Sequence, residues 1–304
     1  MTIRNGAEGV RGGGLENEGG LTLTRITVSG NIAQQGGGLW NNGGTVTINS
    51  STISGNTAYN PRCKFFCLFQ GGGIYNQGAL TVNNSTISGN SATSGGSGIF
   101  NLGHTATINR STFSGNSFAN WYGTVTISQS TFSGNGAGIT VIPGGTASVS
   151  NSTMNSIGVG GKVILSNCTV SGSSGTGISV AGTSSKVVLQ NSIVANNSGG
   201  NCSIRSGGTI ASRGHNLSSD ATCDFDAASD LNNIDPMLGP LQKNGGPTQT
   251  MALPSGSPAI DAGNPHGCRD NLGNLLNTDQ RGMPRHDKED TGGCDMGAYE
   301  SQRD

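Results

Sequence analysis

The first two thirds of the chain repeat a motif of about 25 residues, and this repeat constrains the fold more than any other feature. An apolar residue precedes Ser-Gly-Asn at Val28, Ile53, Ile87 and Phe113, with spacings of 25, 34 and 26 residues. Weaker copies continue through Phe132, Met154, Val170 and Val194. The clearest copies read GGGLENEGGLTLTRITVSGNIA from Gly12, GGGLWNNGGTVTINSSTISGNTA from Gly36, GGGIYNQGALTVNNSTISGNSA from Gly71 and GSGIFNLGHTATINRSTFSGNSF from Gly96.

Each copy alternates apolar and polar residues with a period of two, as in TVTINSSTI, which predicts short β-strands. Gly and Asn interrupt the strands, and both residues tolerate the positive φ of tight turns. A single copy cannot bury its apolar face, but copies stacked in register can. The sequence therefore predicts an all-β fold, a right-handed parallel β-helix solenoid with a loop-rich C-terminal capping region.

The distribution of charge divides the chain. No Asp or Glu lies between Gly19 and Ser219, whereas fourteen acids and six bases follow from Asp220 to Asp304. We expect β-helix repeats over residues 1–200 and a C-terminal cap over residues 201–304. The eight bases of the first stretch are too scattered for a nucleic-acid face, so we expect no nucleic-acid partner.

No stretch approaches the roughly 18 apolar residues of a membrane span, and the first residues lack a signal-peptide core.

Two columns of residues recur at fixed positions of the repeat. The position three residues after the anchor is mostly Asn, and stacked Asn side chains can hydrogen-bond from coil to coil. This predicted structural ladder contains Asn31, Asn56, Asn90, Asn116, Asn135 and Asn197. Two residues before the anchor, most copies have Ser and one has Cys168, which we interpret as a small buried side chain. Trp40, Tyr75 and Phe100 share one repeat position and predict a stacked aromatic column in the core.

The repeat resembles that of chlamydial-type polymorphic outer-membrane proteins, which combine a GG-small-aliphatic motif with FxxN. The matching segments are Gly36 to Leu39, Gly71 to Ile74, Phe113 to Asn116 and Phe132 to Asn135. In other copies Val28, Ile53 and Ile87 replace the Phe.

The C-terminal third is similar to the bacterial choice-of-anchor Q domain family. The segments that carry this resemblance are NSIVANNSGGNC, SRGHNLSSDATC, DLNNIDPMLGPLQKNGGPTQTMALPSGSPAIDAGNP, TDQRGMPR and CDMGAYE, between Asn191 and Glu300. The resemblance implies a β-helix with a characteristic tail, located at the cell surface or outside the cell. Proteins of this family usually carry a surface-sorting segment after the tail, whereas only SQRD follows Glu300 here. We therefore expect a fragment or truncated product that would contact a membrane only through an anchor absent from this chain.

The seven cysteines suggest disulfides. Cys202 with Cys223 and Cys268 with Cys294 would close loops in the tail, Cys63 with Cys67 would close an inserted loop, and Cys168 would remain free. A zinc site is the weaker alternative, because the spacings do not match common zinc motifs. Disulfides would place the protein outside the cytoplasm.

Acidic residues gather in the tail, where they could serve an enzyme or a cap. Polysaccharide lyases and glycoside hydrolases of this shape need carboxylates, either to hold calcium or as acid and base. The candidates are Asp261, Asp279, Asp287, Asp290, Asp295 and Glu300, beside His266 and His286. The alternative is a polar cap whose carboxylates pair with Arg269, Arg281 and Arg285. Apart from this possible calcium site, we expect no metal and no cofactor.

These observations favour a non-enzymatic, secreted or cell-surface structural or adhesive module. We expect a monomer whose long polar sides contact a polysaccharide or a cell-surface glycan. The insertion around Cys63 to Cys67 breaks the regular repeat, and we predict Phe65 and Phe66 as its contact residues. The alternative is a polysaccharide lyase or glycoside hydrolase with carboxylates in the C-terminal region. An enzyme requires convergent carboxylates in a groove, whereas a cap requires carboxylates paired with arginine.

Overall fold

The structure, a computed structural model, describes residues 1–304 except 7–8, 60–69, 135–137, 286–292 and 303–304. It has two compact units. Unit 1 contains Met1–Thr126 and Phe132–Thr146, and unit 2 contains Ile127–Thr131 and Ala147–Asp304. Among the described residues there is no helix long and apolar enough to cross a membrane. Three strands have residues in both units, namely β17 (Thr124–Ser128), β18 (Thr131–Ser133) and β20 (Thr146–Ser150).

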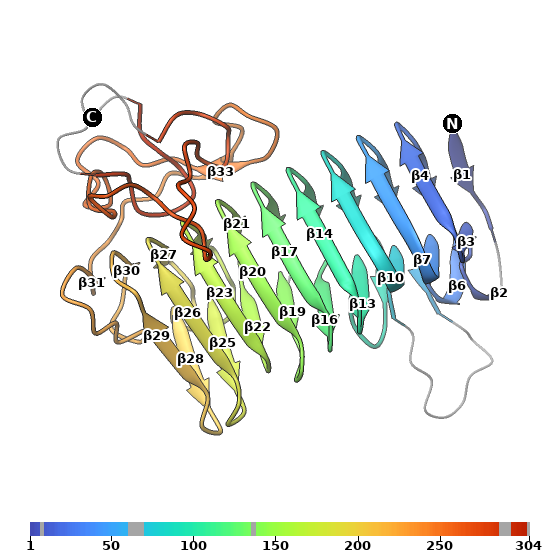
Figure 1. Ribbon diagram of the computed structural model, residues 1–304, viewed down its shortest axis with the longest axis horizontal. Helices are drawn as coiled ribbons and strands as arrows, with labels where there is room; N and C mark the ends of the chain where they lie inside the picture. Colours follow the sequence, from blue (N-terminus) through green and yellow to red (C-terminus); the bar gives the residue numbers. More distant parts are fainter. Residues whose placement is uncertain (7–8, 60–69, 135–137, 286–292, 303–304) are drawn as a thin grey trace. The chain divides into compact units, whose positions relative to one another are not determined.

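Unit 1 is a stack of parallel β-helical coils (Figure 1). One sheet contains β1 (Thr2–Arg4), β5 (Thr27–Ser29), β8 (Thr52–Ser54), β11 (Thr86–Ser88) and β15 (Thr112–Ser114). A second contains β2 (Gly9–Arg11), β6 (Ile32–Gln35), β9 (Thr57–Ala58) and β12 (Ser91–Ala92). The third contains β3 (Leu15–Asn17), β4 (Gly20–Thr24), β7 (Leu39–Asn49), β10 (Ile74–Asn83), β13 (Ile99–Leu102), β14 (Thr105–Asn109), β16 (Phe118–Trp121) and β19 (Ile139–Val141).

Equivalent residues of successive coils lie directly beside one another in unit 1. Val28 pairs with Ile53, Ile53 with Ile87, and Ile87 with Phe113, and all four side chains are fully buried. The predicted aromatic column also lies in the core, with Tyr75 stacked on Phe100 at 5.5 Å between ring centroids. The anchors of the sequence repeat are therefore the core columns of a parallel β-helix, as the sequence predicts.

The glycines of the repeat allow the coils to pack closely. Gly37 is the middle residue of one Gly-Gly-Gly run, and a Cβ added there would overlap the carbonyl oxygens of Thr57 and Gly72. Neither oxygen can move away, because each belongs to the backbone of the stack. The motif therefore marks a place where only a residue without a side chain fits.

Two asparagine ladders run through unit 1. In the predicted ladder, Asn31 donates to Asn56 Oδ1 at 2.9 Å, Asn56 to Asn90 at 2.9 Å, and Asn90 to Asn116 at 2.7 Å. Asn135 lies outside the described residues, and Asn197 of unit 2 accepts from the Ser173 amide at 3.0 Å. A second ladder, which the sequence analysis missed, has amide-to-amide distances of 2.6–2.8 Å and contains Asn17, Asn41, Asn76, Asn101 and Asn120.

Replacing Asn56 with alanine is expected to lower the free energy of unfolding of unit 1 by about 2–4 kcal/mol. The Asn56 side chain is fully buried, and its loss removes the acceptor of the Asn31 backbone amide together with the side-chain bonds to Asn31 and Asn90. Urea unfolding followed by tryptophan fluorescence measures this, because Trp40 and Trp121 both lie in unit 1. Asn42→Ala is the control, since Asn42 makes an exposed bond to Glu18; an equal loss in both variants would contradict the ladder's role.

Unit 2 contains further parallel coils and the tail. Its strands form the rows β21 (Thr153–Met154), β24 (Thr169–Ser171), β27 (Ile193–Ala195), β30 (Leu217–Ser218) and β31 (Leu231–Asn232); β22 (Ile157–Val159), β25 (Ile178–Ala181) and β28 (Cys202–Arg205); and β23 (Lys162–Ser166), β26 (Lys186–Gln190) and β29 (Thr209–Ser212). We expected the cap to begin at residue 201, but β28 to β31 pair with the preceding coils, so the stack continues to Asn232.

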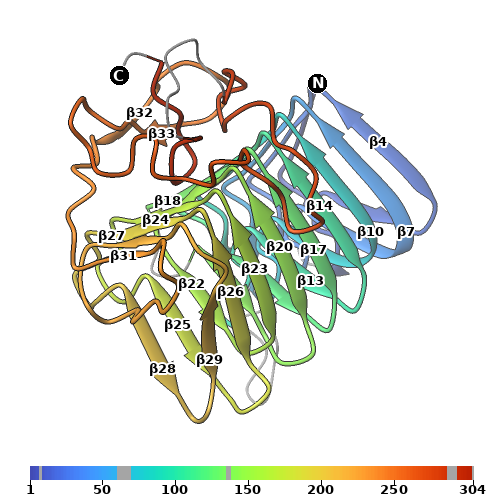
Figure 2. The ribbon, with the colours of Figure 1, turned by 60° about the vertical axis from the view of Figure 1, so that its left-hand side comes forward.

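The tail, residues 233–302 as far as they are described, is rich in loops. Its one pair of strands among the described residues is antiparallel, β32 (Leu241–Gln242) with β33 (Thr250–Met251). Figure 2 shows the tail, coloured orange to red, above the coils of unit 2. Met296, Ala259 and Leu253 of the tail pack with Ile193 and Leu217 of the coils in one apolar cluster. The tail thus belongs to the core of unit 2.

Candidate functional site

A column of polar residues at one corner of the coils holds the tail. Four of the residues directly follow β17, β20, β23 and β26, the fifth comes after β29 and two further residues, and all five have a positive φ of 43–58°. Asn adopts this conformation more readily than most residues, which accounts for its frequency here. We call this set the corner column, and it contains Gln129, Asn151, Asn167, Asn191 and His215.

The corner column binds mainly backbone groups of the tail. Asn151 and Asn167 donate to the carbonyl oxygens of Thr278 and Arg269, each at 2.8 Å. Asn191 donates to Asp295 O at 2.9 Å and accepts from the Asn264 amide at 2.9 Å. Gln129 donates to Asp279 O at 3.1 Å. Successive coils thus contact successive parts of the tail, a role that the sequence analysis did not detect although Asn recurs at this position.

The acidic residues Asp279 and Glu300 are buried and paired with arginine. Arg281 Nε donates to Asp279 Oδ2 at 2.7 Å, and Arg285 Nη1 donates to Glu300 Oε2 at 2.7 Å. Asp279 also accepts from the backbone amides of Arg281 and Met283, at 2.8 and 3.0 Å. Arg285, which is fully buried, donates further to Asn151 and to Gly297 O.

Asp295 is also buried, and its two carboxylate oxygens accept from the backbone amides of Asp261 and Ser301. Arg269 was expected to pair with a carboxylate, but within the described part of the chain its guanidinium donates to the carbonyl oxygens of Gly273 and His266. Asp287, Asp290 and His286 lie outside the described residues. Asp279, Asp295 and Glu300 therefore act within the described structure as a buried framework that organises the tail.

Two disulfides close loops in unit 2, Cys202–Cys223 and Cys268–Cys294. Both match the pairs expected from the sequence, whereas Cys63 and Cys67 lie outside the described residues. The Cys268 sulfur also accepts from Asn191 Nδ2 at 2.9 Å, so this disulfide lies against the corner column. Disulfides persist in oxidising environments, which favours an extracellular location. Among the described residues, no group of three or more His, Cys, Asp or Glu side chains could hold a metal ion.

Cys168 is expected to be unreactive in the folded protein. Burial raises the pKa of its thiol to about 12, against the smaller effect of backbone hydrogen bonds with Ser152 and Ser166. In a variant with Cys63→Ser and Cys67→Ser, Ellman's reagent at pH 8 should detect no thiol until urea is added, and then one thiol per chain. Rapid labelling without urea would contradict burial of Cys168. Cys168→Ser should fold normally, because Ser occupies the equivalent position of most coils.

Asp220 connects the end of the stack to the loop after it. Burial raises the pKa of Asp220, but hydrogen bonds from Thr222, Asn201 and Ser218 outweigh it and hold the pKa below the ordinary value of 3.8. Since the folded-state pKa is the lower one, this carboxylate stabilises the fold above about pH 4 and ceases to do so as the pH falls through the folded-state pKa.

Asp220→Asn is therefore expected to lower the free energy of unfolding of unit 2 at pH 7. In this variant the free energy of unfolding should also fall less than in wild type when the pH is lowered. Urea unfolding from pH 7 to pH 2, followed by far-UV circular dichroism, tests this. Asp224→Asn serves as the control because Asp224 is exposed. Parallel pH profiles for wild type and Asp220→Asn would contradict the assignment.

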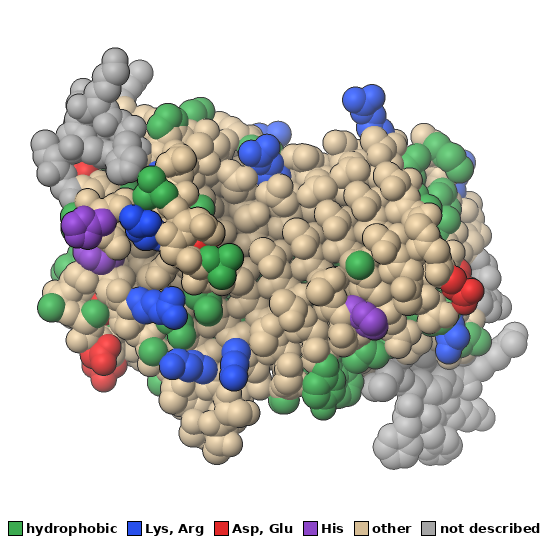
Figure 3. All heavy atoms as spheres, in the orientation of Figure 1, with side chains coloured by type: hydrophobic (Ala, Val, Ile, Leu, Met, Phe, Trp, Pro, Cys, Tyr) green, Lys and Arg blue, Asp and Glu red, His purple; other side chains and the backbone are tan. Residues whose placement is uncertain are grey.

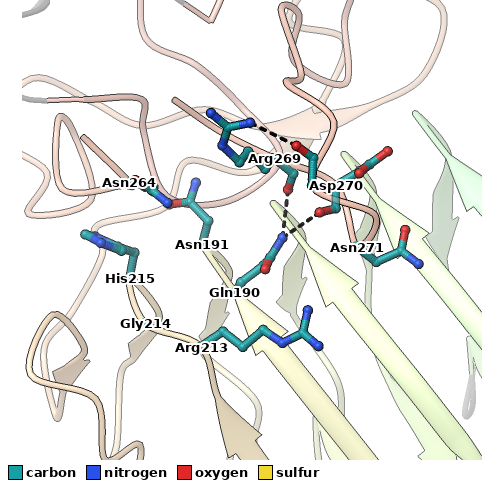
Figure 4. A pocket seen from close by; sticks show the side chains of 10 residues that line it. Gln190, Asn191, Arg213, Gly214, His215, Asn264, Arg269, Asp270 and Asn271 are labelled. Atoms are coloured by element: carbon teal, nitrogen blue, oxygen red, sulfur yellow. Dashed lines mark hydrogen bonds between the residues drawn. The ribbon is translucent and has the colours of Figure 1, made fainter. Parts of the chain in front are cut away.

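An open cleft of about 130 Å³ lies in unit 2 between the corner column and the tail (Figure 4). Gln190 lies between Arg213 and Arg269, and its Nε2 donates to the carbonyl oxygens of Arg269 and Asp270 at 2.8 and 3.0 Å. We call it the Arg213 cleft, and it is lined by Gln190, Asn191, Arg213, Gly214, His215, Asn264, Arg269, Asp270, Asn271 and Gly273. The cleft combines residues from four separate segments, so none of them was predicted from the sequence as part of a binding site.

The polar groups of the Arg213 cleft are unequally engaged. His215 Nδ1 lies 3.1 Å from Ala262 O, and since a carbonyl only accepts, Nδ1 carries the proton. The Asp270 carboxylate accepts from the amides of Leu272 and Asn274 and from the Asn274 side chain. Arg213 is exposed, and its guanidinium has no hydrogen bond or ion pair to any described residue. The cleft therefore presents unsatisfied donors, whereas its one carboxylate is already occupied.

The described residues thus contain a tail held by the corner column, a buried ionic framework and the Arg213 cleft. No family model matches the chain, and neither the curated proteins nor the solved structures include a significant match.

Proposed function

We propose that the chain is a non-enzymatic, secreted or cell-surface module with a structural or adhesive role that contacts glycans. One observation carries this proposal: Asp279, Asp295 and Glu300, three of the acidic candidates from the sequence, are buried and engaged by arginine or backbone amides. A lyase or hydrolase needs such groups exposed to its substrate.

The two disulfides and the parallel coils agree with an extracellular role. The resemblance of the C-terminal segments to the choice-of-anchor Q domain family supports placement at the cell surface. In Figure 3, the face of unit 1 that carries β7, β10 and β14 has few charged side chains, so it offers a largely uncharged contact surface. Glycans are polar and extended, which makes them suitable partners for such a surface.

Two assays on one sample test the proposal. Immobilised neutral and acidic polysaccharides should retain the protein, and the same polysaccharides with added calcium should show no new reducing ends. Reproducible turnover by the wild-type protein would instead support a polysaccharide lyase or glycoside hydrolase. A purified, folded chain that binds no glycan would overturn the adhesive proposal.

The inserted segment remains a second proposed contact. Phe65 and Phe66 lie outside the described residues, so their role depends on sequence alone. Phe65→Ser with Phe66→Ser should weaken glycan retention while leaving the circular dichroism spectrum unchanged. Undiminished retention would remove these residues from the proposal.

A further inference from the structure

We infer that the Arg213 cleft binds the anionic group of an acidic sugar, a carboxylate or a sulfate, on a glycan. This inference rests on the proposed glycan contact and names the chemical class of glycan. Arg213 and Arg269 both contribute exposed guanidinium groups to the cleft, and guanidinium is well suited to planar carboxylate and to sulfate oxygens.

The charge within the cleft favours an anion. Its charged side chains are Arg213, Arg269 and Asp270. The Asp270 carboxylate is held by three donors of its own loop, at 2.8–2.9 Å. Figure 3 shows Lys and Arg side chains gathered over β26, β29 and the nearby tail. An incoming anion would therefore meet a net positive surface.

The remaining lining suits a sugar ring. Gln190 uses its Nε2 to hold the tail, so its Oε1 is left to accept from a hydroxyl group. The Asn264 side chain uses Oδ1 to accept from the His266 amide, which leaves its Nδ2 to donate. Every residue that lines the cleft is polar, charged or glycine. The volume of about 130 Å³ is far below that of a drug-sized pocket, roughly 300–1,000 Å³, so the cleft suits a small group at one end of a larger ligand.

Arg213→Gln is the variant of choice, because the Arg213 side chain contacts no described residue through a hydrogen bond or ion pair. Its matched control is Arg205→Gln, which removes the same charge from an exposed position of unit 2 outside the cleft. Calorimetric titration would use three probes: an oligogalacturonate, a sulfated carrageenan oligosaccharide of equal length, and maltotriose. Circular dichroism confirms that the variants are folded.

We expect wild type to bind at least one acidic oligosaccharide more tightly than maltotriose, and Arg213→Gln to weaken that binding about tenfold. Arg205→Gln should change it less than about twofold. The preferred acidic probe distinguishes carboxylate from sulfate. If binding of the acidic oligosaccharide weakens equally in both variants, or in neither, the Arg213 cleft is not its binding site. The proposed glycan-binding function would still stand. Tighter binding of maltotriose than of either acidic probe would also overturn the inference about the cleft. If wild type binds no glycan, either in the titrations or on the immobilised polysaccharides, then both the inference and the proposed function are wrong.

Discussion

Replacing Arg285 with alanine is expected to destabilise unit 2 by about 3–5 kcal/mol. The Arg285 guanidinium is fully buried and donates to Glu300, Asn151 and Gly297. Without it, the Glu300 carboxylate stays buried with its charge uncompensated by a cation. Hydrogen exchange of peptides from the tail, combined with urea unfolding by far-UV circular dichroism, measures the loss. Tryptophan fluorescence does not serve here, because both tryptophans lie in unit 1.

Two further variants define what this result means. Arg269→Ala removes an exposed guanidinium whose partners among the described residues are carbonyl oxygens, and it should cost no more than about 1 kcal/mol. Arg285→Met combined with Glu300→Gln should recover part of the stability, since it removes both charges together. Unchanged exchange in Arg285→Ala would show that the ionic framework does not hold the tail.

Removal of the Cys268–Cys294 disulfide by serine substitution is expected to cost about 3–4 kcal/mol, on the chain-entropy estimate for a sequence separation of 26 residues. Exchange should rise across residues 262–285 and 293–302, because the bond lies against Asn191 of the corner column. The matched variant lacks Cys202–Cys223, which has a similar separation of 21 residues, and its exchange should rise mainly between those cysteines.

The two disulfide variants separate local from general effects. If the two variants raise hydrogen exchange over the same segments, the disulfides stabilise unit 2 only by restricting its unfolded state. If the Cys268–Cys294 variant leaves the tail protected, the corner column holds the tail without the covalent bond.

The columns of unit 1 could be predicted because the repeat places like residues at equal spacing. Val28, Ile53 and Ile87 recur before Ser-Gly-Asn, and parallel stacking then fixes their contacts. The second ladder was equally regular, since an Asn follows two residues after the first aliphatic residue of each clear copy, as at Asn41 and Asn76.

The attachment of the tail could not be predicted in the same way. The tail has no repeat, so nothing in its sequence indicates that Arg285 reaches Asn151, a residue 134 positions earlier. Pairing of acids with arginines was expected as a class, but Arg269 binds carbonyl oxygens instead. The Arg213 cleft depends on the same long-range contacts. Function is hardest to predict where residues from distant segments meet.

The corner column also has a consequence for how the two units unfold. In a simple solenoid each coil interacts only with its neighbours, so coils can be lost one at a time from an end. In unit 2, residues of five coils bind one continuous stretch of tail, from Ala262 to Asp295. Fraying of any one of these coils breaks a bond to a segment that the other coils also hold. We therefore expect unit 2 to unfold as a single cooperative block, with nearly uniform exchange rates along its coils, whereas the coils of unit 1 show a gradient.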